Sequence, residues 1–443
     1  MTNLVERLNA DAKSKRLSSL RELMSFYKSG KLEAPQSNDN VNNHIHTTYS
    51  FSPYSPTMAA YLAWTHGLAT AGIMDHDSVG GLQEFIEAGQ IIGIAVTVGF
   101  EQRVSFKNTP FNGKRINNPD QKSAAYLAMH GIPHDKIEVA EAYLKPYREA
   151  RNVRNRQMAK KLDNFVRKAG LEIDFDRDIL PLSQYNDGGS VTERHILYPL
   201  AIKIMDKLGP GPGVVSFLKD KFDIAVSGNS LEKLNDSGNP WYQYYLLGVL
   251  KGHMVKDFYI DADEELPEYG EFIKLAESIG AIPAYAYLGD VGDSVTGDKV
   301  AERYEDAYLD ELIIFLKDAG FKAITYMPTR NTHEQVRRLA SLCEEHGIFE
   351  ICGEDINSPF QPFICKALER DEFKHLIDAA WALIGHENAA TGSGMFSEEA
   401  IRKYPSLKER VQYFANVARN CNHMGSEAAP TRKLSCLDGE VGP

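Results

Sequence analysis

Short apolar segments alternate with helix-length segments from Val41 onward, and this alternation restricts the chain to few folds. In the first block, strand-like and helix-like runs follow in the order 41–49, 57–70, 72–77, 79–91 and 94–101. A βαβαβ order of this kind predicts parallel strands that are joined by right-handed crossovers. The alternation stops near Phe106 and resumes with strand-like runs at 281–287, 322–327 and 349–352, separated by helix-like runs at 299–318 and 332–345.

The intervening residues 107–270 carry long charged helical stretches instead of strands, for example at 135–170. One βα domain interrupted by a mainly helical insertion explains this order better than three domains in series. We therefore expect an N-terminal helical extension at 1–40, a barrel at 41–106 and 271–360, the insertion at 107–270, and C-terminal helices with a tail at 361–443.

The composition is that of a globular protein that buries its core without disulfides. The chain has 443 residues, of which 43% are hydrophobic, and 49 basic against 61 acidic residues leave a formal charge of −12. This excess of acid argues against nucleic-acid binding by bulk electrostatics, although a few residues could still hold a short or single-stranded substrate.

The cytoplasm is the compartment that we expect from the sequence. Its five cysteines contain no CxxC pair and are typical of reduced thiols. The first 20 residues lack the apolar core of a signal peptide, and the longest apolar run, 91–100, is too short to cross a bilayer. We expect no membrane association, and an oligomer is compatible with the sequence.

Two histidines, His44 and His46, lie two residues apart on the first expected strand. Residues i and i+2 of a strand face the same side, so both imidazoles point to one spot. Because neutral imidazole is a good ligand for Zn, Mn or Fe, the pair predicts a metal site. Two partly exposed histidines at a strand terminus are the alternative.

Acidic residues and a third histidine follow the other strands. Asp75, His76 and Asp77 end the second strand, Glu101 ends the third, and Asp355 follows the last. In a parallel barrel the carboxyl ends of all strands lie on one face, which brings these groups to one rim. Alternatively, Asp75 and Asp77 cap a helix or orient a ligating histidine, and Asp355 caps the turn that follows it.

Five segments carry a resemblance to a known family: HIHTTYS at 44–50, IMDHDSVGGL at 73–82, VGFE at 98–101, GAIPAYAYLGD at 280–290, and the run from GFKAITYM to GEDINSP at 320–359. In this order they resemble the motifs of the PHP (polymerase and histidinol phosphatase) superfamily of metal-dependent phosphoesterases. The resemblance implies an α/β fold, namely a distorted (β/α)7 TIM-like barrel that binds divalent cations at the carboxyl ends of its strands. VTERHI at 191–196 is similar to an arginine-histidine motif in the helical insert of nucleotide-directed members.

The resemblance also implies a ligand set, and part of that set is present. His44 and His46 match the opening HxH motif, and His76, Glu101 and Asp355 match later ligands. Three positions at which the family has ligands carry other residues, namely Phe51, Tyr287 and Asn357, while His130 is a candidate for one further family histidine. We expect one firmly bound divalent ion (Zn, Mn or Fe), and a second ion could bind through Glu101 and either His76 or His195.

The predicted function is that of a metal-dependent hydrolase that acts on a small anionic ester, most simply a phosphoester, by metal-activated water. We assign acid/base roles to His76 or Asp75 and substrate binding to Arg194, His195 and Arg330; surface or structural salt bridges are the alternative for the arginines. Two rival functions stay open. One is a catalytically impaired barrel that binds a phosphorylated or carboxylated ligand without turnover, and the other is hydrolysis or elimination at a non-phosphate bond.

Overall fold

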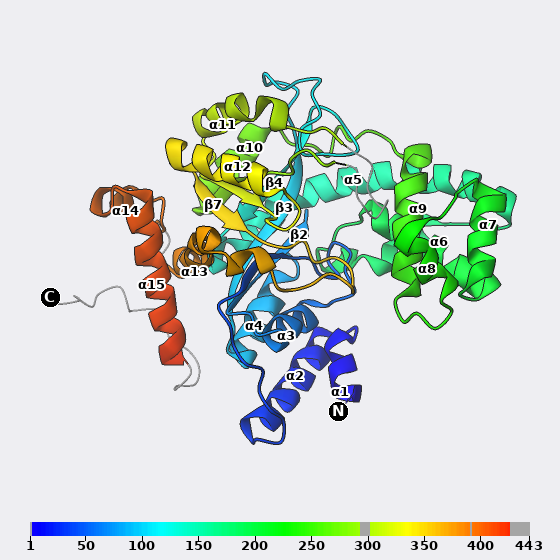
Figure 1. Cartoon of the computed structure of the whole chain (residues 1–443), viewed down its shortest axis with the longest axis horizontal. Coiled ribbons are helices and arrows are strands. Elements are labelled where there is room, and N and C mark those ends of the chain that lie inside the picture. Colours follow the sequence, from blue (N-terminus) through cyan, green and yellow to red (C-terminus); the bar gives the residue numbers. More distant parts are fainter. Residues whose placement is uncertain (1, 293–301, 390–391, 426–443) are drawn as a thin grey trace.

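The computed structural model describes residues 2–292, 302–389 and 392–425, and it shows a barrel with helices packed around it (Figure 1). The strands are β1 (Val41–Ile45), β2 (Thr70–His76), β3 (Ala95–Ser105), β4 (Ala124–His130), β5 (Ile282–Ala286), β6 (Ala323–Tyr326) and β7 (Phe349–Cys352). The helices around the barrel and at the chain ends are α1 (Thr2–Glu6), α2 (Lys13–Lys28), α3 (Pro56–Thr65), α4 (Leu82–Ile92), α10 (Tyr269–Ile279), α11 (Leu309–Asp318), α12 (His333–His346), α13 (His375–Asn388), α14 (Glu398–Lys403) and α15 (Leu407–Gly425). The inserted helices are α5 (Ile137–Val166), α6 (Glu193–Leu208), α7 (Pro212–Phe222), α8 (Gly228–Asn235) and α9 (Tyr242–Phe258).

The strands follow one another around the sheet in chain order, from β1 to β7. β1, β2 and β3 are parallel, and so are β5, β6 and β7, whereas β4 runs antiparallel to both of its neighbours. A bridge between Ile45 and Ile356 brings the end of β1 beside the segment after β7. The sheet is therefore a nearly closed barrel, and the expected α/β barrel architecture is confirmed with β4 as an antiparallel exception.

β4 lies within residues 107–270, which the sequence predicts to be a mainly helical insertion. Residues 106–123 connect β3 to β4 without a helix. A parallel β4 would need a crossover connection, which is usually a helix. This connection has no helix, and β4 runs antiparallel to β3. The barrel therefore takes a strand from the segment that was expected to be inserted, and the helical part begins at α5.

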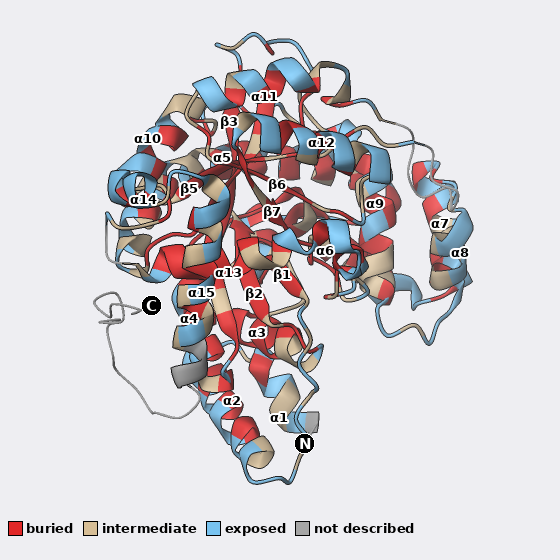
Figure 2. Cartoon of the chain, turned by 60° about the vertical axis from the view of Figure 1, so that its left-hand side comes forward, coloured by how far each residue is buried: buried red, intermediate tan, exposed pale blue. Residues whose placement is uncertain are grey.

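The barrel strands are buried on both faces (Figure 2). Every residue of β1 and β6 is buried, and β2 and β3 each contain a single residue that is only partly buried. Strands that helices cover in this way read as near-continuous apolar runs, which explains the pattern seen in the sequence. Polar side chains inside such a core are exceptions, and several of them belong to the site.

Local signals set the helix ends. The Ser55 hydroxyl accepts a hydrogen bond from the Met58 amide at 3.0 Å, and Pro56 occupies the first position of α3. α12 begins after a capping Thr332 and ends at Gly347, whose φ of 66° is left-handed.

The insertion, α5 to α9, has a hydrophobic core of its own and lies to one side of the barrel (Figure 1, green). Buried ion pairs join it to the barrel. The Glu265 carboxylate accepts from Arg103 of β3 at 2.6 Å and from Arg154 of α5 at 2.6 Å. Loss of one partner would leave a buried charge unpaired, so this network holds the insertion in place.

The chain ends pack on other parts of the barrel. Arg16 of α2 donates to the Glu84 carboxylate of α4 at 2.7 Å, and α13 packs against β1, β3 and β7. Residues 299–301 of the helix expected at 299–318 and residues 426–443 of the expected tail lie outside the described residues. None of the helices in the described part of the chain combines the length and the apolar composition that a membrane span requires.

Candidate metal centre

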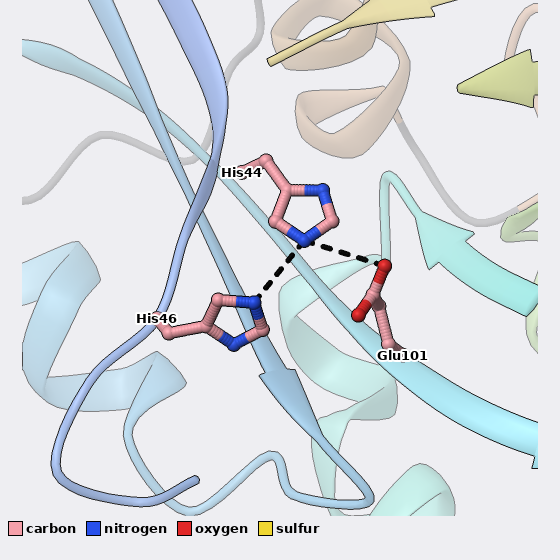
Figure 3. A group of neighbouring side chains, drawn as sticks. All are labelled: His44, His46 and Glu101. Atoms are coloured by element: carbon pink, nitrogen blue, oxygen red, sulfur yellow. Dashed lines mark hydrogen bonds and ion pairs between the residues drawn. The ribbon is translucent and has the colours of Figure 1, made fainter. Parts of the chain in front are cut away.

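Five side chains that were expected to bind a metal converge at one end of the barrel. The Nε2 atom of His44 lies 3.2 Å from Nε2 of His46 and 3.3 Å from Oε1 of Glu101 (Figure 3). Asp355 Oδ1 lies 3.3 Å from His46 Nε2, and His76 Nδ1 lies 3.2 Å from Glu101 Oε2. The structure therefore brings together groups that are more than 250 residues apart in the sequence.

Strand pairing explains this convergence. His76 and Glu101 are register partners on β2 and β3, so their side chains project from neighbouring positions on the same face. His44 and His46 lie on one face of the segment that ends β1. The Ile356 amide donates to the His44 carbonyl at 3.1 Å, and the His46 amide donates to the Ile356 carbonyl at 3.0 Å, which holds the segment containing Asp355 beside β1.

The electrostatics of the group favour a cation. Burial opposes protonation of His44, but Glu101 and Asp355 outweigh burial and raise the pKa of His44 to about 9. Burial alone would raise the pKa of Glu101. The neighbouring histidines outweigh burial and lower the pKa of Glu101 to about 2. The pKa of Asp355 falls well below its usual value, because His46, His44 and Arg194 outweigh burial. Both carboxylates are therefore ionised at neutral pH, whereas His44 carries a proton that a metal ion would have to displace.

The donor chemistry fits a divalent transition metal. One ligand atom from each of His44, His46 and Glu101 lies within 4.8 Å of the others, and Asp355 adds a second carboxylate. Burial and the nearby His46 lower the pKa of His76 to about 3, so its ring is neutral and can act as a ligand. Imidazole nitrogen together with carboxylate oxygen suits Zn, Mn or Fe.

Asp75 lies outside this group, although its neighbour His76 belongs to it. Successive strand residues face opposite sides, so the Asp75 carboxylate points away from the cavity. It is fully buried and accepts hydrogen bonds from the Thr47 amide at 2.7 Å, the Thr47 hydroxyl at 2.6 Å and the Ser50 hydroxyl at 2.5 Å. Ser50 Oγ also lies 3.1 Å from His46 Nδ1. Asp75 therefore orients His46 through Ser50, and its predicted acid/base role stays a prediction.

The three positions that depart from the family ligands have other contacts here. Phe51 adopts a φ of 87° and packs edge-on against His195 at 5.0 Å, within the core of the insertion. The Tyr287 hydroxyl donates to Asp306 at 2.5 Å. The Asn357 amide donates to Asp355 at 2.6 Å and so orients a metal-binding carboxylate. Phe51 therefore offers no lone pair to the metal group, and the Tyr287 hydroxyl is directed to Asp306.

Two predicted histidines lie away from the metal group. His195 is buried near the start of α6, where its Nδ1 accepts from the Thr192 amide at 3.0 Å, and it does not line the cavity. His130 pairs with Ile282 at the first residue of β5. On β4, His130 shares a face with Ala128, the register partner of Glu101, and burial lowers the pKa of His130 to about 3, with the charges of His44 and Glu101 also acting on it. Within the described residues no hydrogen bond or ion pair joins His195 or His130 to the metal group, and their roles in substrate or metal binding stay predictions.

A cavity of about 550 Å³ opens at the metal group, between the barrel and the insertion. Arg194 and Arg330, which were predicted to bind substrate, both line it. Lining residues that the sequence did not single out include Tyr126, Arg151 and Lys251. Tyr126 packs 5.6 Å from His76, ring centre to ring centre, and recognition of β4 as a strand could have revealed it. Arg151 and Lys251 lie on helices and carry no motif.

Two solved structures are similar to this chain at low sequence identity. An amidohydrolase from Chromobacterium violaceum, with bound sulfate and no metal, is 20% identical, with 76% of this chain and 96% of that chain covered and a TM-score of 0.48. A protein described as a metal-dependent phosphoesterase from Bifidobacterium adolescentis is 19% identical, with 84% of this chain and 96% of that chain covered and a TM-score of 0.48. No family model matches the chain, and no curated protein matches it. A similarity of this size assigns no activity, so function is inferred from the residues of the site.

Proposed function

We propose that this protein is a metal-dependent hydrolase of small anionic esters, and that phosphoesters are its substrate class. The observation that carries the proposal is the convergence of two imidazoles and two carboxylates, from His44, His46, Glu101 and Asp355, in a cavity that also contains arginines. We also propose membership of the PHP superfamily, which the sequence motifs support, and Zn, Mn or Fe as the ion.

His44, His46, Glu101 and Asp355 would hold the ion, and His76 stands beside Glu101 as a further ligand or as a proton carrier. When bound, such a cation acts as a Lewis acid and lowers the pKa of coordinated water from 15.7 towards about 7. Hydrolysis adds water across the ester P–O bond and leaves an alkoxide that needs a proton. The neutral His76 ring, with Nδ1 beside Glu101, could accept a proton from the attacking water at Nε2 and pass it to the alkoxide.

Arg194 and Arg330 are the groups that would hold the anionic part of the substrate. No residue of the described part of the chain forms a hydrogen bond or ion pair with the Arg194 side chain, although it lies near Asp355. Arg330 donates through Nε to the Leu288 carbonyl at 3.3 Å, which fixes its guanidinium and leaves the terminal nitrogens available. A guanidinium fork matches the geometry of phosphate oxygens.

A second candidate function is ligand binding without turnover. The contacts of Phe51 and Tyr287 favour it, because neither side chain can complete a cluster of several ions. A single ion that is held by a buried carboxylate pair could then serve to bind a phosphorylated or carboxylated ligand. Turnover is the property that separates the two functions.

The test is to purify the full chain, to measure bound transition metal by elemental analysis, and to assay a phosphoester panel with added Mn or Zn. His46→Ala is the control. About one equivalent of metal, together with hydrolysis that His46→Ala abolishes, supports the hydrolase. Metal without turnover supports ligand binding, and a protein that binds no transition metal contradicts both functions.

We propose the cytoplasm as the compartment. Among the described cysteines, Cys343, Cys352 and Cys365 are buried, and these three form no disulfides. Burial raises the pKa of each of these three thiols, which keeps them protonated and unreactive. Buried thiols of this kind suit a reducing compartment.

A further inference from the structure

Lys251 lies in the wall of the metal-site cavity, and no sequence motif points to it. It belongs to α9 of the insertion, is half-buried, and lines the same cavity as His44, His46 and Asp355. Within residues 2–292, 302–389 and 392–425, no side chain or carbonyl forms a hydrogen bond or ion pair with the Lys251 ammonium. A half-buried ammonium without a partner is costly, which makes its position in this cavity informative.

The neighbour with the largest effect on Lys251 carries the same charge. Arg194, on α6, lowers the pKa of Lys251, and burial lowers it further. α6 and α9 pack against each other, so the two cations are presented together by a rigid part of the insertion. Two like charges that line one cavity repel each other, and a bound anion would relieve that repulsion.

The acids around this pair are mostly engaged with other groups. The Glu193 carboxylate lies 3.5 Å from Arg151 and 3.3 Å from Arg154. Asp355 faces His46 and accepts from Asn357. Asp120 is the remaining acid of the cavity whose charge acts on Lys251, and burial raises the pKa of Asp120. Asp120 acts on Lys251 and not on Arg194, so the two cations keep positive charge for an anionic ligand.

We propose that Lys251 and Arg194 together bind a dianionic group, such as a terminal phosphoryl group, and that Lys251 selects a dianion over a monoanion. This inference rests on the proposed function, since it assigns the charge preference of the same site. An arginine fork can engage two phosphate oxygens while a lysine adds a point charge to a third. A monoanionic diester or carboxylate needs only the contact with the Arg194 guanidinium.

The proposal is tested by the binding of two simple anions to the metal-loaded full-length protein, measured by calorimetry at pH 7.5. The anions are inorganic phosphate, which is largely dianionic at this pH, and the monoanion dimethyl phosphate. We expect Lys251→Met to weaken phosphate binding about 10- to 100-fold and to affect dimethyl phosphate much less. Lys251→Arg should retain phosphate binding. Lys256→Met, on the exposed side of α9, is the matched control and should change neither affinity.

Unchanged phosphate affinity in Lys251→Met would overturn the proposal, because Lys251 would then be only a solvated neighbour of Asp120. Equal losses for both anions, or no phosphate binding by the wild type, would also overturn it. If Lys251→Met does not fold, Lys251→Gln replaces it. With a phosphate monoester as substrate, we expect Lys251→Met to raise KM while kcat and bound metal stay near wild type. A wild type that binds metal and phosphate but hydrolyses nothing contradicts the hydrolase and leaves the anion site supported.

Discussion

A Cβ atom added to Gly353 would lie 2.6 Å from the Cβ atom of His44, which is closer than packed carbon atoms approach. Gly353 directly follows β7, and His44 belongs to β1, so this approach sets how closely the two strands meet. The segment after Gly353 carries Asp355. The distance between His44 and Asp355 therefore depends on residue 353 being a glycine, which has no Cβ atom.

Gly353→Ala should separate β1 from the Asp355 segment and weaken metal binding by roughly 10-fold or more, as a displaced ligand does. Competition with a chromophoric chelator measures this affinity. Gly270→Ala is the matched control, because a Cβ atom at Gly270 would meet nothing within 4 Å. Equal affinities for the two variants would show that the site tolerates a shift of β7.

Asp75→Asn should weaken metal binding by about 10- to 100-fold, because an amide cannot accept all the hydrogen bonds that Thr47 and Ser50 donate to the carboxylate. The effect would reach the metal through Ser50 and His46. Metal content and the pH profile of kcat are the two measurements. Intact metal binding with loss of one limb of the pH profile would instead indicate direct proton transfer by Asp75. Asp318→Asn, at an exposed position, serves as the control.

His46→Ala and His195→Ala should separate metal binding from structural support. His46 lies within reach of His44 and Asp355, so we expect its variant to lose the metal. His195 accepts from the Thr192 amide and packs on Phe51, so its variant should keep the metal and lose on the order of 1–3 kcal/mol in free energy of unfolding. Elemental analysis and urea unfolding measure the two quantities. Metal loss in His195→Ala would contradict the assignment.

Glu305→Gln should stabilise the protein at alkaline pH. Glu305 is fully buried, and burial raises its pKa from 4.5 to about 7, although the Leu288 and Gly289 amides donate to it. Between pH 4.5 and 7 the folded state holds a proton that the unfolded chain releases, so stability is highest below pH 4.5 and falls as pH rises through about 7.

Glutamine removes this titration and keeps an acceptor for the two amides. We expect a gain on the order of 1–3 kcal/mol at pH 8 and little change at pH 4.5. Urea unfolding at both pH values provides the measurement. A gain of the same size at both pH values would show that packing, and not ionisation, is responsible.

Much of the candidate site could be predicted from short sequence intervals. His44 and His46 share a face because strand side chains alternate with a period of two, and this holds wherever the strand packs. Glu101 and Asp355 were placed near strand ends from the apolar runs before them. These local rules brought the groups to one rim, and the family resemblance then named His76, Glu101 and Asp355 as ligands beside His44 and His46. They could not separate His76 from Asp75, because the face that a residue presents depends on how β2 pairs with its neighbours.

The sequence by itself determined the α/β class, the interrupted barrel and the types of donor atom available to a metal. Tertiary structure alone decided which of these donors meet. The antiparallel course of β4 put Tyr126 beside His76. The packing of α6 on α9 placed Lys251 near Arg194 in the same cavity. Such relationships join residues that are distant in the chain, so they follow from strand pairing and helix packing and cannot be read from local periodicity.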